Sequence, residues 1–118
     1  MTILDGAYLE NVFAEDVVIL ENFAPYVFRG PDAKARWREG FRDHAATLAG
    51  LKMKFGEPQD FSRDGDRAYF VLPTTWTGRT RETAFEEHGG WAFVLVEDGL
   101  RWRIASYAWA VTDFRLVV

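Results

Sequence analysis

A tight turn near the C-terminus joins two long apolar segments, and it constrains the fold more than any other feature. Asp98 and Gly99 follow the run 90–96, GWAFVLV, and precede the run 100–110, LRWRIASYAWA. Aspartate and glycine tolerate the positive φ angles that a two-residue hairpin turn needs. The pattern therefore predicts an antiparallel β-hairpin.

The strand after this turn has apolar side chains on both of its faces. Alternate residues of a strand point to opposite sides, so Trp102, Ile104 and Ala108 are expected on one face. Tyr107 and Trp109 are expected on the other face. Because both faces are apolar, we expect helices of the chain to cover one and enclose a cavity. A partner chain is expected to cover the other face, with Tyr107 at the interface.

Length and composition limit the class of protein. The 118 residues predict one domain, residues 1–118, with a single core. A net charge of −4 without a basic run argues against nucleic acid and anionic membranes as partners. The chain has no cysteine, which excludes disulfides and thiolate catalysis. Without a signal-peptide pattern or a long apolar run, a cytoplasmic location is expected.

The first half of the chain predicts two helices separated by a short strand. A first helix capped by Asp5 is expected to end near Ala14, and residues 16–20 form a buried strand. Proline in the segment 29–32, RGPD, favours the start of a second helix. Gly50 is expected to end it. Its apolar stripe comprises Ala33, Trp37, Phe41, Ala45 and Leu48.

The second half predicts four antiparallel strands. Their expected ranges are 51–61, 67–77, 83–96 and 100–111, with a turn at 64–66 and a bend at Gly89 and Gly90. The tail 112–118 is expected to pair with an edge or cover it. Helices followed by consecutive strands predict the α+β class, with the helices on one face of a curved sheet.

Four segments of the chain resemble the nuclear transport factor 2-like superfamily, and more narrowly its SnoaL-like or ketosteroid-isomerase-like branch. They are residues 5–19, residues 28–37 (FRGPDA with Trp37), residues 65–69 (GDRAY) and residues 98–104 (DGLRWRI). The resemblance implies a cone-shaped, curved antiparallel sheet wrapped around helices, an apolar pocket at one end, and a homodimer formed through the sheet. The first helix is shorter than is usual in the family, so we expect a more open pocket, a pocket covered by a partner, or a native start further upstream.

The loop before the second helix carries two candidate functional residues. The resemblance implies a carboxylate base near Glu21 and Asn22, so Glu21 is a candidate catalytic residue if it points into the cone. The alternative is a strand-end glutamate in solvent. Tyr26 would donate a hydrogen bond to a ligand carbonyl, or it would pack with its hydroxyl on a backbone carbonyl.

His88 is the second candidate catalytic residue. Glu86 and His88 share one strand face, whereas Glu87 points the other way. A neighbouring carboxylate suits an acid–base histidine, and the expected bend at Gly89 would bring His88 over the cavity. The alternative is a solvated, charged hairpin. His44 is expected to pack at the edge of the helix stripe, and the histidines lack metal-ligand spacing, so no metal or cofactor is predicted.

Aromatic residues of the helix and the sheet are the predicted ligand contacts. Trp37 and Phe41 come from the helix stripe, and Trp76 and Trp109 come from the strands. Ligand pockets are mostly apolar, with a few polar groups. The alternative assigns most of the aromatic residues to the core and to a dimer interface, where tryptophan and tyrosine are enriched.

These observations predict a protein that holds a small apolar or carbonyl-bearing molecule. Its chemistry would be a cofactor-free isomerisation, cyclisation or dehydration by proton transfer, with Glu21 or His88 as the base. The same fold also hosts proteins without catalytic activity. The alternative function is therefore a dimeric ligand-binding or assembly module.

Overall fold

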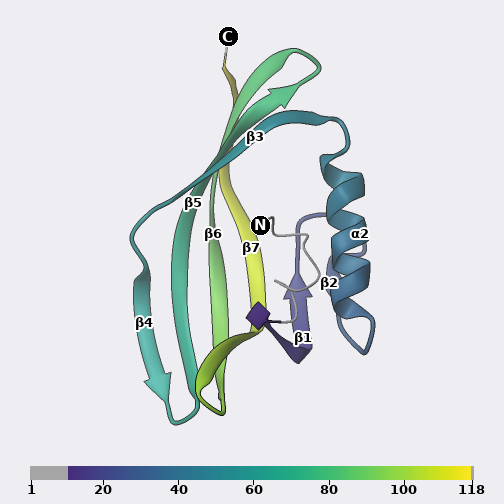
Figure 1. Ribbon diagram of the computed structural model, residues 1–118. Helices are drawn as coiled ribbons and strands as arrows, with labels where there is room; N and C mark the ends of the chain where they lie inside the picture. Colours follow the sequence, from purple (N-terminus) through teal and green to yellow (C-terminus); the bar gives the residue numbers. More distant parts are fainter. Residues whose placement is uncertain (1–10, 118) are drawn as a thin grey trace.

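The computed structural model describes residues 11–117, and Figure 1 shows a strongly curved sheet with one helix beside it. The elements are β1 (Phe13–Leu20), β2 (Val27–Phe28), α2 (Ala33–Ala45), β3 (Leu48–Phe55), β4 (Gln59–Asp64), β5 (Arg67–Thr80), β6 (Thr83–Asp98) and β7 (Arg101–Val117). The start of the predicted first helix lies outside the described residues. Residues 11 and 12 are helical and β1 begins at Phe13, so that helix ends earlier than predicted.

The strands form one sheet in the order β2-β1-β7-β6-β5-β3, and β4 pairs with β5 beyond the end of β3. β1 and β7 are parallel, and the other pairs are antiparallel. In Figure 1, α2 stands opposite the concave side of the sheet, and β3 crosses from the end of the helix to the far strands. This arrangement confirms the predicted α+β cone.

The predicted hairpin forms between β6 and β7. Asp98 pairs with Arg101, so the two turn residues are Gly99 and Leu100, one position later than predicted. Gly99 has φ +66°, a conformation that glycine adopts at little cost. The predicted tail pairs with β6 as far as Val117 and extends β7.

Two boundaries differ from the prediction because of proline and glycine. The expected strand 51–61 is two strands, β3 and β4, because residues 56–58, which include Pro58, interrupt the pairing. The helix α2 ends at Ala45 and not at Gly50. Gly50 instead has φ +61° inside β3, where the register with β5 shifts. Its positive φ therefore serves a β-bulge.

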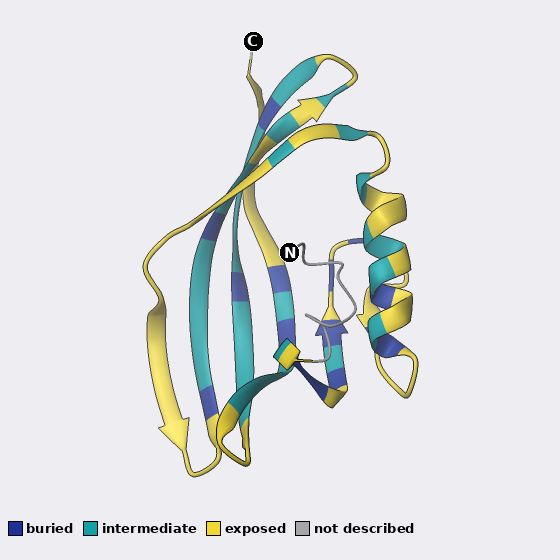
Figure 2. Cartoon of the chain, viewed as in Figure 1, coloured by how far each residue is buried: buried dark blue, intermediate teal, exposed yellow. Residues whose placement is uncertain are grey.

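The core lies between α2, β1 and the concave side of β6 and β7. Trp37, Phe28, Ile19 and Val17 are almost completely buried, and Figure 2 shows the buried residues gathered along these elements. Trp37 meets the ring of Phe13 edge to face, with centroids 5.8 Å apart. Such edge-to-face contacts add to the stabilisation from burial alone.

Tyr107 belongs to this core and not to an outer face. It is 3% exposed, and its ring lies 5.1 Å from that of Trp91. The alternation of side chains breaks because β7 has one extra residue here: Leu95 pairs with Ile104, whereas Val94 pairs with Ser106. This bulge places Ile104, Tyr107 and the following Trp109 on the concave side together.

The convex side of the sheet carries small apolar residues. Val71, Ala92 and Ala108 lie side by side across β5, β6 and β7, and Val94 follows on β6. All four are at least partly accessible. Within residues 11–117, no helix is long and apolar enough to cross a membrane.

Candidate functional site

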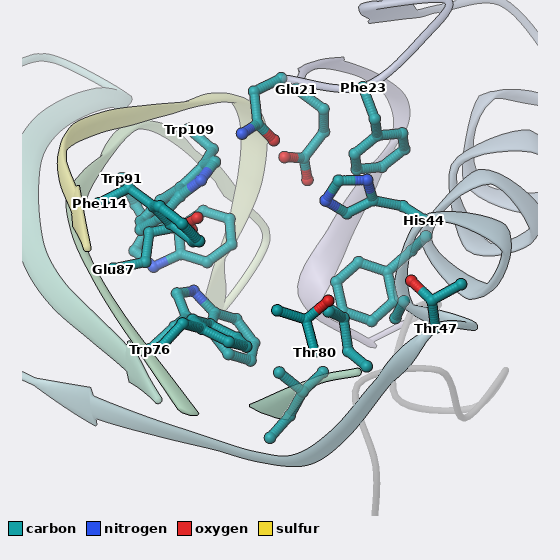
Figure 3. A pocket seen from close by; sticks show the side chains of 16 residues that line it. Glu21, Phe23, His44, Thr47, Trp76, Thr80, Glu87, Trp91, Trp109 and Phe114 are labelled. Carbon is teal, nitrogen blue, oxygen red and sulfur yellow. The ribbon is translucent and has the colours of Figure 1, made fainter. Parts of the chain in front are cut away.

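A cavity of about 420 Å³ lies between α2, the loop after β1, and the strands β3, β5, β6 and β7. Aromatic side chains make up much of its wall. They come from the helix as Phe41 and from the sheet as Trp76, Phe85, Trp91, Trp109 and Phe114. The polar side chains at the wall include Glu21, His44 and Glu87, and Figure 3 shows these three around the same space. Its size and its few convergent polar groups are typical of small-molecule sites.

Glu21 is held firmly where the chain leaves β1. Its backbone N–H donates to the carbonyl of Tyr26 across 3.0 Å. The indole N–H of Trp37 donates to its Oε2 at 2.8 Å, and the hydroxyl of Tyr107 donates to the same atom at 2.5 Å. No hydrogen bond within residues 11–117 reaches its other oxygen, Oε1. The carboxylate is therefore oriented through one oxygen only.

Burial and hydrogen bonding act on Glu21 in opposite directions. Burial raises its pKa above the ordinary value of 4.5, because a low-dielectric surrounding disfavours the charged form. The hydrogen bonds from Tyr107 and Trp37 lower the pKa and offset part of that rise. The pKa of Tyr107 lies well above its ordinary value, first through burial and then through the charge of Glu21. Tyr107 thus stays protonated and remains a donor.

Two further titratable groups face the cavity. Burial raises the pKa of Glu87, whose carboxylate has no hydrogen bond or ion pair within the described part of the chain. His44 projects from α2, and its ring stacks on Phe23 with centroids 4.9 Å apart. Its ring nitrogens have no hydrogen-bond partner among residues 11–117. Both groups are therefore available to a ligand.

The structure brings some of the predicted site residues together and separates others. Glu21, Phe41, Trp76 and Trp109 all line the cavity. Trp37 does not line it, because it is completely buried behind Glu21 and orients that carboxylate.

Tyr26 does not line the cavity either. It is 60% exposed, because the loop between β1 and β2 turns its side chain outward. Neither the contact with a ligand carbonyl nor the packed alternative fits this position.

His88 lies on the convex side of the sheet, outside the cavity. Its Nε2 is 2.5 Å from Glu86 Oε1, and its Nδ1 is 3.2 Å from the hydroxyl of Thr75. Arg115 also donates to Glu86. The expected position over the cavity is corrected: β6 stays in continuous register with β5 through the two glycines, so its alternation turns Glu87 inward and His88 outward.

Two titratable cavity residues, Glu87 and His44, were not among the predicted site residues. Glu87 shares its strand face with Phe85 and Trp91. These apolar neighbours were the available signal that its side chain points inward. His44 follows Trp37 by seven residues, close to two helical turns, which places both on the same side of α2. Tyr107 shares its strand face with Trp109, a predicted ligand contact, and this alternation was the available signal for its inward position.

The comparisons with known proteins show the fold. No protein-family model and no curated protein matches the chain. The structure is similar to that of a type 2 hexachlorocyclohexane dehydrochlorinase, LinA, with a TM-score of 0.79 and 8% identity over 97% of this chain and 76% of that one.

Two further solved structures are similar. A scytalone dehydratase-like protein from Novosphingobium aromaticivorans has a TM-score of 0.70 and 15% identity, over 95% of this chain and 76% of that one. Rv3472 of Mycobacterium tuberculosis, a protein of unknown function, has a TM-score of 0.70 and 22% identity, over 92% of this chain and 61% of that one. The chain therefore has the cone-shaped fold of the nuclear transport factor 2-like superfamily, and at these identities the likeness extends to the fold alone.

Proposed function

We propose that the chain binds a small, largely apolar molecule in its cavity and transfers a proton at a carbon beside a carbonyl or a leaving group, without a cofactor. One observation carries the proposal. A buried carboxylate, Glu21, lies at the wall of an aromatic cavity with one oxygen fixed by two donors and the other free of hydrogen bonds within residues 11–117. A carboxylate in this environment is suited to act as a general base.

The raised pKa of Glu21 supports this role. A carboxylate with a higher pKa is a stronger base, and catalytic groups work best when their pKa lies nearer the working pH. The donors on Oε2 hold the group in one orientation, so Oε1 is the atom assigned to accept the proton. The Tyr107 hydroxyl donates to Glu21, so Tyr107 acts as a positioning residue.

A second group is needed to stabilise or protonate the far side of the substrate. His44 and Glu87 both face the cavity, and neither has a hydrogen-bond partner in the described chain. His44 would donate through a ring N–H to a carbonyl oxygen during isomerisation, or to a departing group during elimination. Two of the similar structures are named as a dehydrochlorinase and as a scytalone dehydratase-like protein. Elimination is therefore one of the reactions to test.

The proposal is tested by a thermal-shift screen followed by turnover of each hit. The panel contains enones, steroids, aromatic polyketides, terpenoid epoxides, scytalone and hexachlorocyclohexane. A ligand at about 100 times its Kd adds roughly 2.7 kcal/mol to the free energy of unfolding. The Glu21→Gln variant is expected to bind the hit and lose its turnover, whereas Glu86→Gln keeps both. Turnover that survives in Glu21→Gln contradicts the assignment.

The second candidate function is a non-catalytic dimeric module, and the convex side of the sheet favours it. Val71, Ala92, Val94 and Ala108 form an apolar patch on this side. A homodimer through this face is compatible with the proton-transfer proposal, because the residues that line the cavity lie on the concave side. Turnover distinguishes the two candidate functions, because an assembly module would dimerise and would convert none of the compounds in the panel.

A further inference from the structure

The wall of the cavity around Glu87 has an unusual combination of charge and aromatic surface. Glu87 on β6 pairs directly with Trp76 on β5 and with Phe114 on β7, and all three line the cavity. Side chains at directly opposed positions of neighbouring strands lie close enough to touch. Glu87 is therefore flanked on the sheet by two aromatic residues.

Nothing in the described chain neutralises this carboxylate. None of the described residues that line the cavity is lysine or arginine, and Glu87 has no ion pair or hydrogen bond within residues 11–117. The neighbouring Glu86, on the convex side, shows the contrast. Its carboxylate contacts both Arg115, at 3.2 Å, and His88. The chain thus pairs the outward glutamate and leaves the inward one unpaired.

The second carboxylate of the cavity has the same sign. Glu21 is stabilised by two neutral donors, Trp37 and Tyr107, and by no cation among residues 11–117. A partly buried carboxylate without a cationic partner is costly, and a bound cation would offset that cost. Aromatic faces also attract cations, most strongly when water is excluded.

We propose that the ligand of this cavity carries a protonated amine or a quaternary ammonium group, held between Glu87 and the rings of Trp76 and Phe114. This inference rests on the proposed function, because it names the class of molecule that occupies the same cavity. The apolar remainder of the ligand then lies toward Glu21, against Trp91 and Trp109. A carbonyl compound with a basic nitrogen fits both ends.

The test compares two probes of the same shape and different charge. Benzyltrimethylammonium is the cation, and neopentylbenzene is its neutral carbon isostere. Quenching of tryptophan fluorescence measures both affinities, because Trp76, Trp91 and Trp109 all line the cavity. We expect the cation to bind about tenfold more tightly than the isostere, since tenfold corresponds to about 1.4 kcal/mol, within the range of a cation–π contact with an ion pair.

Matched variants show whether Glu87 is the cause. Glu87→Gln is expected to remove most of the preference for the cation, since only the cation–π contact remains, and to leave the affinity of the isostere unchanged. Glu86→Gln removes the same charge from the convex side and is expected to keep the preference. Thermal unfolding of both variants confirms that they fold.

Each of the other results overturns the inference. If the isostere binds as tightly as the cation, the cavity binds ligands but does not select cations, and the proposed function stands alone. If neither probe binds the wild-type chain, the proposed small-molecule site fails as well. If the full preference survives in Glu87→Gln, the carboxylate of Glu87 does not hold the cation, and the inference fails.

Discussion

The hydroxyl of Tyr107 donates a hydrogen bond to Oε2 of Glu21 at 2.5 Å, which connects two residues separated by 86 positions in the sequence. Both groups are buried, and Trp37 donates to the same oxygen. The interaction joins the residue that follows β1 to the strand β7 and fixes the carboxylate at the cavity wall. The proposed chemistry depends on this orientation.

Removal of the tyrosine hydroxyl should destabilise the fold. We expect Tyr107→Phe to lower the free energy of unfolding by about 1.5–3 kcal/mol, the usual range for a hydrogen bond to a charged group. Urea unfolding measures this difference. Tyr69→Phe is the control, because the Tyr69 hydroxyl, on the convex side, has no hydrogen bond in the described chain. Equal effects of the two substitutions would contradict a specific role for Tyr107.

The stability of the chain should fall as pH rises through the range set by Glu21. Burial raises the pKa of Glu21 in the folded state, so the folded chain holds a proton that the unfolded chain has lost. The contribution of Glu21 to the free energy of unfolding is therefore largest below pH 4.5. It declines as the pH rises to the raised pKa of the folded state. Urea unfolding between pH 4 and pH 8 should give a shallower decline for Glu21→Gln. Parallel pH profiles for the variant and the wild type would show that Glu21 does not titrate in this way.

Glu86 provides a control of opposite sign for that pH series. Hydrogen bonds from His88 and then Arg115 lower the pKa of Glu86. Its contribution to stability is present above pH 4.5 and is lost as the pH falls through the lowered value. Glu86→Gln should therefore change the profile only at the acidic end.

Gly89 is predicted to be essential for the position of Trp109. A Cβ at Gly89 would lie 2.3 Å from the backbone oxygen of Ala110 and 2.7 Å from the Trp109 ring. Gly89→Ala should therefore move the backbone or the indole and lower stability by about 1–3 kcal/mol, as other overpacked sites do. It should also weaken ligand binding in the cavity. Gly90→Ala is the matched control, because its nearest neighbour would be Val71 at 3.5 Å, an ordinary contact; equal losses in the two variants would contradict this account.

The homodimer through the sheet remains a prediction. Because Tyr107 is buried in the core, the interface is tested at the convex side of the sheet. We expect Val94→Lys to give monomers, because a charge would lie in the middle of the apolar face. Val27→Lys, on the edge strand β2, is the control. Light scattering measures the mass of each variant. A dimer that persists in Val94→Lys would exclude this face as the interface.

The sequence was a good guide to the fold because its strands are long and their turns carry glycine. The hairpin at Gly99 and the turn at Gly65 could both be predicted from residues that accept positive φ. The bulges could not. Gly50 and the extra residue beside Ile104 change the register of β3 and β7, and a single sequence does not show where a strand departs from regular pairing.

The candidate site was only partly predictable for the same reason. Glu21 was singled out by the family resemblance, which implies a base near this position, and the structure places it at the cavity wall. His88 and Glu87 are neighbours on β6, so the choice between them depended on which face of the strand turns inward. The expected bend at the two glycines favoured His88, whereas the regular pairing with β5 selects Glu87.

Deuterium exchange at carbon tests the central claim most directly, because it detects proton abstraction even when no net reaction follows. A ketone identified by the thermal-shift screen is incubated with the protein in deuterated buffer, and NMR follows the loss of the hydrogen beside the carbonyl. The account predicts exchange by the wild type that falls about 10²–10⁴-fold in Glu21→Gln, the usual contribution of a general base, while ketone binding persists. Exchange at equal rates in both proteins would contradict the assignment of Glu21 as the base.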